Sequence, residues 1–174
     1  MGGGRARVLV IGYGNPGRLD DGLGPAVAAA LEELRVPGVV VAADYQLMVE
    51  DAAVVAEHDV VIFADADASG PEPFSFQRIE PSSAVSFTSH SVSPSALLAL
   101  ARDLFGAETR GYVLGVRGYE FNEFGERLSP KARTNLDAAL AFIERVLREG
   151  SFDDAAERAG KRPVAAATTS CEDG

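Results

Sequence analysis

The chain has 174 residues, of which 47% are hydrophobic, and a formal net charge of -10 at pH 7. A chain of this size and composition can bury a substantial core without disulfides or a structural metal cluster, so we expect one domain. The acidic balance opposes a nucleic-acid partner, because such binding relies on Lys and Arg to neutralise phosphates.

Membrane and secretory segments are not indicated by the sequence. No stretch approaches the roughly 20 consecutive apolar residues that span a bilayer. The apolar stretch near the start breaks at Gly12, too early for the core of a signal peptide. The single cysteine, Cys171, suits a reducing compartment, and its polar surroundings favour a surface thiol over a nucleophile. We therefore expect a soluble, cytoplasmic protein with no membrane partner.

Short apolar runs rich in β-branched residues alternate with helical patterns along the chain. Pro37-Gly38 ends the first helical pattern, and Ser93-Pro94 and Ser129-Pro130 each match the N-cap and N1 signal of a helix start. The expected strands are 8–11, 39–43, 59–65, 74–79 and 112–116, and the expected helices are 23–35, 47–57, 93–105 and 129–150.

This alternation predicts an α/β fold, with a three-layer, doubly wound mixed sheet of about five strands and helices on both faces. Residues 39–43 read as a buried strand, whereas 74–79 alternates apolar and polar residues like a half-exposed edge strand. The domain is expected to span residues 1–150. The segment 151–174 is rich in alanine and charge with little periodicity, which predicts a disordered tail.

The first strand runs into a glycine-rich stretch at residues 12–25, GYGNPGRLDDGLGP. Its start matches G-x-G-x-x-G, which with Asp44 further on permits a dinucleotide-binding alternative. In such a site the helix begins within the motif, whereas here Pro16 and then Asp20 and Asp21 precede the next helix. A carboxylate about 4 Å from a phosphate oxygen costs roughly 4 kcal/mol at an effective dielectric near 20. The acids therefore favour a cation over a phosphate.

Three aspartates, Asp21, Asp44 and Asp65, follow predicted strands. The carboxyl ends of parallel strands meet at one edge of a sheet, where ligands of such folds gather. Asp44 and Asp65 could each, taken alone, simply satisfy amides at a strand-to-helix junction. Together their charges would repel one another in one cleft unless a cation or a shared proton relieved them, so their convergence favours a site. Asp67, Asp20 and Glu50 lie close by in sequence; Asp20 is expected to cap the first helix and Glu50 to face solvent or pair with a local base.

The sequence Gly-Asn-Pro-Gly at residues 14–17 resembles the start of the peptidyl-tRNA hydrolases. That family continues with a segment that carries its catalytic histidine, whereas this chain has no histidine before His58. We expect His58 to be structural or solvated, since it precedes the third strand and so lies opposite the cleft.

Taken whole, the glycine-rich stretch resembles the nickel–iron hydrogenase maturation endopeptidases. The resemblance extends to the Ala-Asp-Ala word at 64–66 and to His90 before a later helix, and it covers about residues 8–148. It implies that Asp21, Asp65 and His90 are metal ligands. Residues 44–50 depart from the Asp-Gly-Gly-Thr word of many members and look more like the branch that serves soluble, NAD-reducing hydrogenases.

The resemblance implies a nickel-dependent endopeptidase that removes the C-terminal extension of a hydrogenase large-subunit precursor, with Ni²⁺ supplied by that precursor. Two carboxylates and one imidazole with open positions also suit zinc or manganese. Asp44 is the candidate for an acid, base or metal-orienting role in catalysis, and the polar, aromatic segment 119–128 is the candidate for partner recognition. A nickel-recognising chaperone that cuts nothing is the alternative from another functional class.

Overall fold

The computed structural model describes residues 4–82 and 92–161. His90 and Cys171 lie outside these residues. Five strands and five α-helices are seen in the described chain, with one short 3-10 helix, η1. Their bounds are β1 Val8–Tyr13, η1 Leu19–Gly22, α1 Leu23–Leu34, β2 Val39–Asp44, α2 Asp51–Ala56, β3 Val60–Asp67, β4 Phe74–Ile79, α3 Pro94–Phe105, β5 Arg110–Arg117, α4 Pro130–Glu149 and α5 Phe152–Gly160.

The strands form one mixed sheet in the order β2-β1-β3-β5-β4. β2, β1, β3 and β5 are parallel, and β4 runs antiparallel to β5 at one edge. β1 and β3 lie in the interior of the sheet, which explains their apolar runs, VLVIG in β1 and VVIFA in β3. Parallel strands covered on both faces have no solvent side on which to place polar residues.

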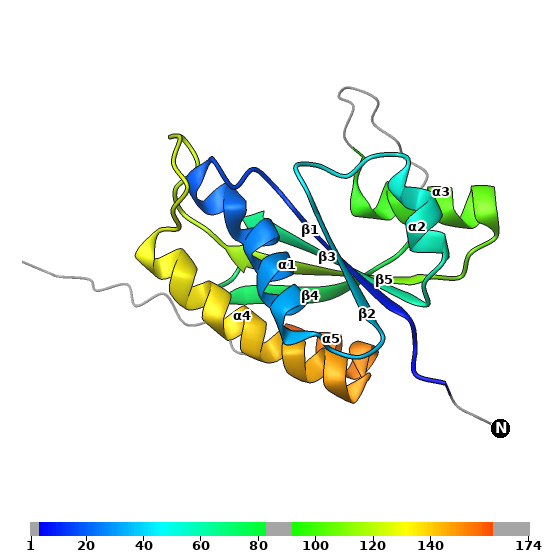
Figure 1. Ribbon diagram of the computed structural model, residues 1–174. Coiled ribbons are helices and arrows are strands. Elements are labelled where there is room, and N and C mark those ends of the chain that lie inside the picture. Colours follow the sequence, from blue (N-terminus) through cyan, green and yellow to red (C-terminus); the bar gives the residue numbers. More distant parts are fainter. Residues whose placement is uncertain (1–3, 83–91, 162–174) are drawn as a thin grey trace, which may run out of the picture.

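Helices cover both faces of the sheet, as predicted (Figure 1). α1 and α4 pack on one face together with α5, and α2 and α3 pack on the other. Each face has its own cluster of buried side chains, so the sheet separates two hydrophobic cores. The fold class predicted from sequence, a three-layer α/β arrangement, is therefore confirmed.

The two Ser-Pro signals mark helix starts in the structure. Ser93 caps α3 by accepting a hydrogen bond from the Ala96 amide at 3.2 Å, and Ser129 accepts one from the Ala132 amide at 3.4 Å. In each case the proline occupies the first helical position, where its missing N–H leaves no intrahelical bond unmade.

Three expectations need correction. β2 is an edge strand with mostly exposed residues, because the crossover after β2 places β3 on the far side of β1. α2 begins only at Asp51, since residues 45–50 form a turn-rich connection.

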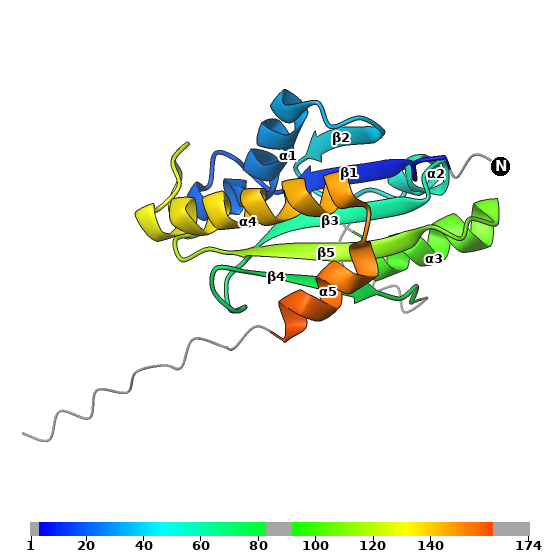
Figure 2. The same ribbon diagram turned by 90° about the horizontal axis from the view of Figure 1, so that it is seen from below.

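The prediction of a disordered tail is wrong for Phe152–Gly160, which form α5 beside β4 (Figure 2). Phe152 lies in the core, 2% exposed, and packs against Tyr112, so one buried aromatic ring anchors this short helix.

Among the described residues, no helix is both long and apolar enough to cross a membrane.

Candidate active site

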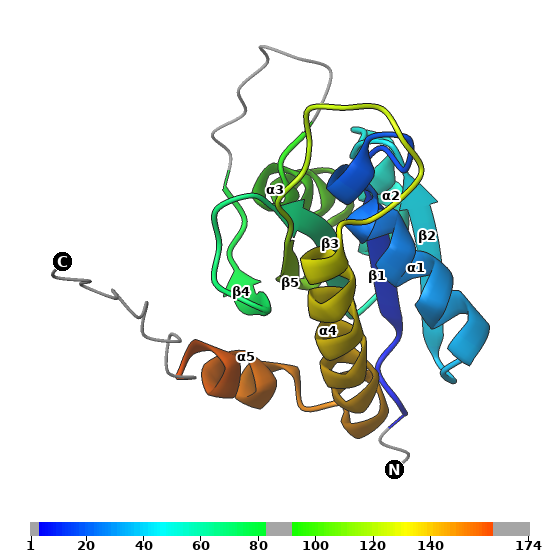
Figure 3. The same ribbon diagram turned by 90° about the vertical axis from the view of Figure 1, so that its left-hand side faces the viewer.

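Two loops lie against each other at the carboxyl ends of the parallel strands. The first contains the glycine-rich stretch and η1, and the second, residues 118–129, connects β5 to α4 and arches over η1 (Figure 3). The backbone of Gly125 bonds to both Gly17 and Leu19, at 2.8 and 3.0 Å, and the Asp20 amide donates to Glu120 at 2.9 Å. The loops therefore form one backbone-bonded unit beside the ends of β1 and β3.

The glycines of the motif allow this chain's own backbone to come close together. A Cβ on Gly12 would lie 2.2 Å from the Gly24 carbonyl oxygen, and one on Gly24 would lie 2.2 Å from that of Tyr13. Gly14 has a φ of +142°, and a Cβ there would lie 2.1 Å from the Asp21 carbonyl oxygen. Larger residues would push α1 and η1 away from the sheet, so these glycines have a packing role that requires no phosphate.

The Asp21 side chain, in η1, is held by a backbone amide at the start of the glycine-rich stretch. Its carboxylate accepts a hydrogen bond from the Asn15 amide at 2.8 Å, and the Asn15 side chain in turn accepts one from the Gly17 amide at 2.9 Å. The Asp21 side chain is therefore turned back toward the end of β1. This places its negative charge near Asp65 of β3, close enough to act on the pKa of that residue.

Asp65 is a partly buried carboxylate near the end of β3. Burial raises its pKa to about 6, because the charged form loses hydration. Hydrogen bonds from the Ala66 amide, at 2.8 Å, and from the Tyr13 hydroxyl oppose that rise. The charges of Asp21 and Asp67 add to it. The pKa of Tyr13 is also raised. Its burial is the main cause, and the negative charge of Asp65 adds to the effect.

Asp44 ends β2 and stands apart from this pair. β2 is separated from β3 by β1, so Asp44 and Asp65 lie two strand spacings apart, about 10 Å. The Asp44 side chain is exposed and accepts a hydrogen bond from the Tyr45 amide at 2.7 Å. Its backbone carbonyl accepts one from Gly14 at 3.0 Å, which joins the end of β2 to the glycine-rich loop.

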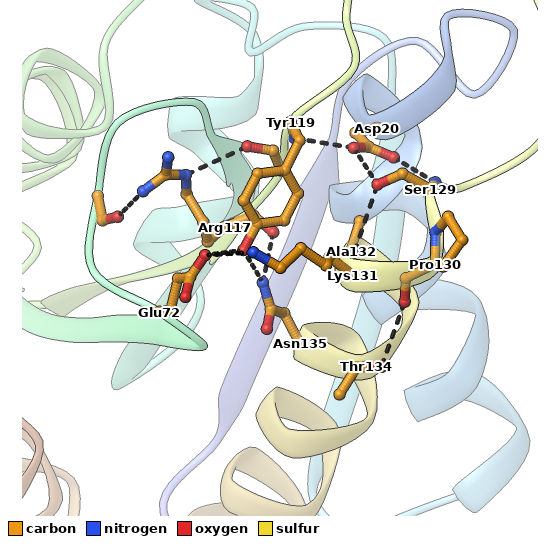
Figure 4. A network of polar contacts seen from close by, with 12 residues as sticks. Asp20, Glu72, Arg117, Tyr119, Ser129, Pro130, Lys131, Ala132, Thr134 and Asn135 are labelled. Atoms are coloured by element: carbon orange, nitrogen blue, oxygen red, sulfur yellow. Dashed lines mark hydrogen bonds and ion pairs between the residues drawn. The ribbon is translucent and has the colours of Figure 1, made fainter. Parts of the chain in front are cut away.

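Asp20, expected to cap the first helix, has another role. It is 0% exposed, and its two carboxylate oxygens accept four hydrogen bonds from the second loop and from the start of α4 (Figure 4). The donors are the Tyr119 amide at 2.8 Å, the Glu120 amide at 3.0 Å, the Ser129 amide at 2.7 Å and the Ser129 hydroxyl at 2.7 Å.

Burial alone would raise the pKa of Asp20, but these four bonds outweigh it and the pKa is lowered. Asp20 is thus the anchor that fastens residues 118–129 to η1.

A second polar cluster extends from this anchor along β5 and α4 (Figure 4). The Tyr119 ring lies between the cations of Arg117 and Lys131, each 5.1 Å from the ring centroid. The Tyr119 hydroxyl bonds to Glu72 and accepts a bond from Asn135 at 3.0 Å. These contacts fix the position at which the loop leaves β5.

The remaining acids and His58 have local roles. Asp67 accepts hydrogen bonds from the Ser69 and Gly70 amides, at 3.1 and 2.8 Å, and so shapes the turn after β3. Glu50 is exposed, as predicted. His58 precedes β3 and its ring nitrogen Nδ1 lies 2.7 Å from the Val54 carbonyl oxygen, which agrees with the structural role expected of it.

The donor set present fits part of a cation site. Asp21 and Asp65 offer two carboxylates, and the charge of Asp21 acts on Asp65, an arrangement that a divalent ion would relieve. Within residues 4–82 and 92–161 no group of three His, Cys, Asp or Glu side chains could hold a metal ion. The third predicted ligand, His90, lies outside those ranges.

Tyr13 is the residue that sequence reasoning missed. β1 and β3 are paired with Gly12 opposite Ala64, so the next residues, Tyr13 and Asp65, are neighbours at the ends of the two strands. The sequence does show a tyrosine at the end of one predicted strand and an aspartate at the end of another. That the two side chains are neighbours follows only from the register between β1 and β3, which the sequence does not give.

Comparison with solved structures places this fold among known ones. No family model matches the sequence, and no curated protein matches it. Hydrogenase maturating endopeptidase HybD from E. coli superposes with a TM-score of 0.64 at 24% identity, covering 83% of this chain and 94% of that one. The maturation protease HycI from Thermococcus kodakarensis KOD1 gives 0.64 at 22%, covering 84% and 95%.

A third similar structure is the hydrogenase 2 maturation peptidase from Thaumarchaeota archaeon SCGC_AB-539-E09. Its TM-score is 0.61 at 25% identity, and the match covers 81% of this chain and 97% of that chain. The chain therefore has the fold of proteins named as hydrogenase maturation proteases, over nearly their whole length.

Proposed function

We propose that this protein is an endopeptidase that removes the C-terminal extension of a nickel–iron hydrogenase large-subunit precursor. The observation that carries the proposal is the acid pair of Asp21 and Asp65, at the carboxyl edge of a sheet with this fold. The fold narrows the class of protein, and the pair supplies a place where a cation can be recognised. Both are needed, because a fold alone hosts many functions.

Nickel enters this proposal as part of the substrate. Asp21 and Asp65 would contact the ion carried by the precursor, and His90 would supply a nitrogen ligand. Val92 is the first described residue after the segment that contains His90, and its amide donates to the Leu47 carbonyl in the connection after β2. This bond ties the chain near His90 to the loop that follows β2, which supports the shared ligand set.

We propose a cytoplasmic enzyme whose substrate belongs to a soluble, NAD-reducing hydrogenase, on the basis of the sequence of residues 44–50. We also propose that Asp44 handles a proton during hydrolysis. Its carboxylate is exposed at the same sheet edge as the acid pair, and a substrate chain that crosses the carboxyl end of β1 from β2 toward β3 would be within its reach.

The direct test is incubation of the protein with a nickel-loaded precursor, followed by mass spectrometry of the product. We expect a precursor shortened at one bond near its C-terminus, and no cleavage of the nickel-free precursor. Stable capture of the nickel-loaded precursor without a shortened product would favour a chaperone. Saturable binding of NAD, not competed by nickel or cadmium, would instead favour the dinucleotide alternative.

Two substitutions separate recognition from catalysis. His90→Ala removes a neutral nitrogen ligand, so we expect weaker capture of the precursor and weaker cleavage in pull-down and single-turnover assays. Asp44→Asn keeps size and hydrogen bonding but deletes charge, so capture should persist while cleavage slows about 10²-fold or more. Normal processing by Asp44→Asn would remove its catalytic role, and normal processing by His90→Ala would contradict nickel recognition.

A further inference from the structure

The outer edge of β2 presents free backbone groups at the sheet margin. The Val8 amide donates to Gly38 at 3.1 Å, and the Gly14 amide donates to Asp44 at 3.0 Å. In a parallel ladder these two bonds fix the alternation: even-numbered residues of β2 turn their N–H and C=O toward β1. The odd-numbered residues Val41 and Ala43 therefore turn theirs outward, where the described chain has no further strand.

Within residues 4–82 and 92–161, a helix protects the opposite edge of the sheet, whereas no helix or strand lies beyond the β2 edge. β4 lies beside α5 (Figure 2). Arg78 of β4 forms an ion pair with Asp153 of that helix at 3.0 Å. β2 has the sequence VVVAAD, with no proline and no charge before its last residue. Val40 is 51% exposed. Charges, proline and covering helices are the usual means of blocking unwanted strand pairing, so a bare edge of this kind is suited to pairing.

The bare edge leads directly to the candidate active site. At its carboxyl end lies a pocket of about 220 Å³, lined by Gly14, Pro16, Pro25, Ala43, Asp44 and Tyr45. Gly14 and Pro16 flank Asn15, whose amide holds the Asp21 carboxylate at 2.8 Å. A chain lying along β2 would therefore enter the pocket and reach the loop that positions Asp21.

We propose that the β2 edge binds an extended segment of the protein substrate, which adds a strand to the sheet. This proposal rests on the proposed endopeptidase function and names the surface that the precursor occupies. The bound segment is basic at the carboxyl end of β2, because Glu50, in the connection after β2, and Asp51, at the start of α2, add negative charge there. The same charges, and a net charge of -10 on each chain, disfavour a second copy of this protein as the occupant.

Strand geometry places the docked segment relative to the cut. A strand added beyond β2 lies three spacings from β3, about 14 Å from Asp65. An extended chain covers about 3.3 Å per residue, so roughly four or five residues link the docked segment to the bond that is cut. Main-chain pairing would give affinity without requiring one particular sequence, while the pocket at the carboxyl end of β2 selects side chains.

Ala43→Pro tests the proposal, because it deletes an outward N–H and leaves the bonds to β1 in place. We expect the KM for nickel-loaded precursor to rise about tenfold, with kcat and the thermal unfolding midpoint close to wild type. Glu108→Pro, in the exposed loop before β5 at the other end of the sheet, is the matched control and should leave both kinetic constants unchanged.

Amide exchange by NMR supplies a readout that does not depend on the proline variant. The probe is a precursor made uncleavable by proline at the cleavage position that mass spectrometry identifies. Binding should slow exchange at Val41 and Ala43 at least tenfold, while the inward-facing Ala42 amide exchanges slowly with or without the precursor.

The outcomes separate this proposal from the proposed function. If the wild type cuts the precursor but Ala43→Pro has a wild-type KM and the Val41 and Ala43 amides stay unprotected, only the edge proposal is overturned. A dimer in sedimentation that Ala43→Pro dissociates, without a change in KM, would also overturn it by making a second copy the occupant. Failure of the wild type to cut would overturn the proposed function itself.

Discussion

Asp20 and Asp65 lie at the same edge of the sheet, and both carboxylates are removed from bulk water to a large extent. Asp20 receives four hydrogen bonds and has a lowered pKa, whereas Asp65 shares its surroundings with Asp21 and Asp67 and has a pKa raised to about 6. Burial is common to both, so the difference between their pKa shifts comes from the groups that surround each carboxylate.

An acid with every oxygen satisfied stabilises the fold. An acid that is partly buried beside other acids costs free energy until a cation or proton arrives, which makes it a candidate functional group. The two aspartates should therefore respond to substitution in opposite ways, and the predictions below test that difference.

The largest effect is expected at Asp20. Asp20→Asn turns an NH₂ group toward backbone and hydroxyl donors, so we expect the free energy of unfolding to fall by about 3 kcal/mol in urea titrations. Asp154→Asn, on the exposed side of α5, is the control and should change it by less than about 0.5 kcal/mol. Equal values for the two variants would show that Asp20 is not the anchor.

The pH dependence at Asp20 has a definite sign. Its folded-state pKa lies below 3.8, the ordinary value for an aspartate, so its stabilising contribution is present above that pH. The contribution is lost as the pH falls below 3.8 and through the folded-state pKa. Wild type should lose stability in this range more steeply than Asp20→Asn, and parallel acid-unfolding curves would contradict the assignment.

Asp65→Asn is expected to act on processing. Loss of the charge should slow cleavage of the nickel-loaded precursor about 10²-fold or more, equivalent to about 2.7 kcal/mol in the activation barrier. Glu33→Gln removes an exposed charge near the end of α1, away from the carboxyl edge of the sheet, and should keep near-normal rates. Single-turnover assays distinguish the two variants. Normal cleavage by Asp65→Asn would show that Asp65 has no role in processing.

The same variant should raise stability, opposite in sign to Asp20→Asn. The folded protein keeps the Asp65 proton up to about pH 6, whereas the unfolded chain releases it near 3.8, so wild-type stability falls as the pH rises between these values. In metal-free buffer at pH 7, Asp65→Asn should be more stable by about 1–2 kcal/mol. The gain should shrink toward pH 4, and a gain independent of pH would need another cause.

The smallest effect should come from Tyr119→Phe, which measures how far the Asp20 anchor depends on its neighbours. The variant removes the hydroxyl that joins Glu72 to Asn135 but leaves the Tyr119 amide bonded to Asp20. We expect a loss of about 1 kcal/mol in urea unfolding. A loss as large as that of Asp20→Asn would mean that the hydroxyl, rather than the buried carboxylate, fixes the loop.

Local sequence determined most of the element types. β-branched runs gave the interior strands, and the Ser93-Pro94 and Ser129-Pro130 signals gave two helix starts, because caps and periodicity depend on residues within one or two turns. The two strand-associated acids, Asp21 and Asp65, could also be placed together, since parallel strands end at one sheet edge.

Only the tertiary structure decided which partners each acid contacts and which strand lies at the edge of the sheet. The partners of Asp20 lie 99 to 109 residues further along the chain, so no local pattern distinguishes it from Asp21. β2 and β3 are both apolar in sequence, yet strand order places one at the edge and the other in the interior. α5 depends on Phe152 reaching a core built by distant residues. These features arise from contacts between segments far apart in sequence, and the strand order brings those segments together.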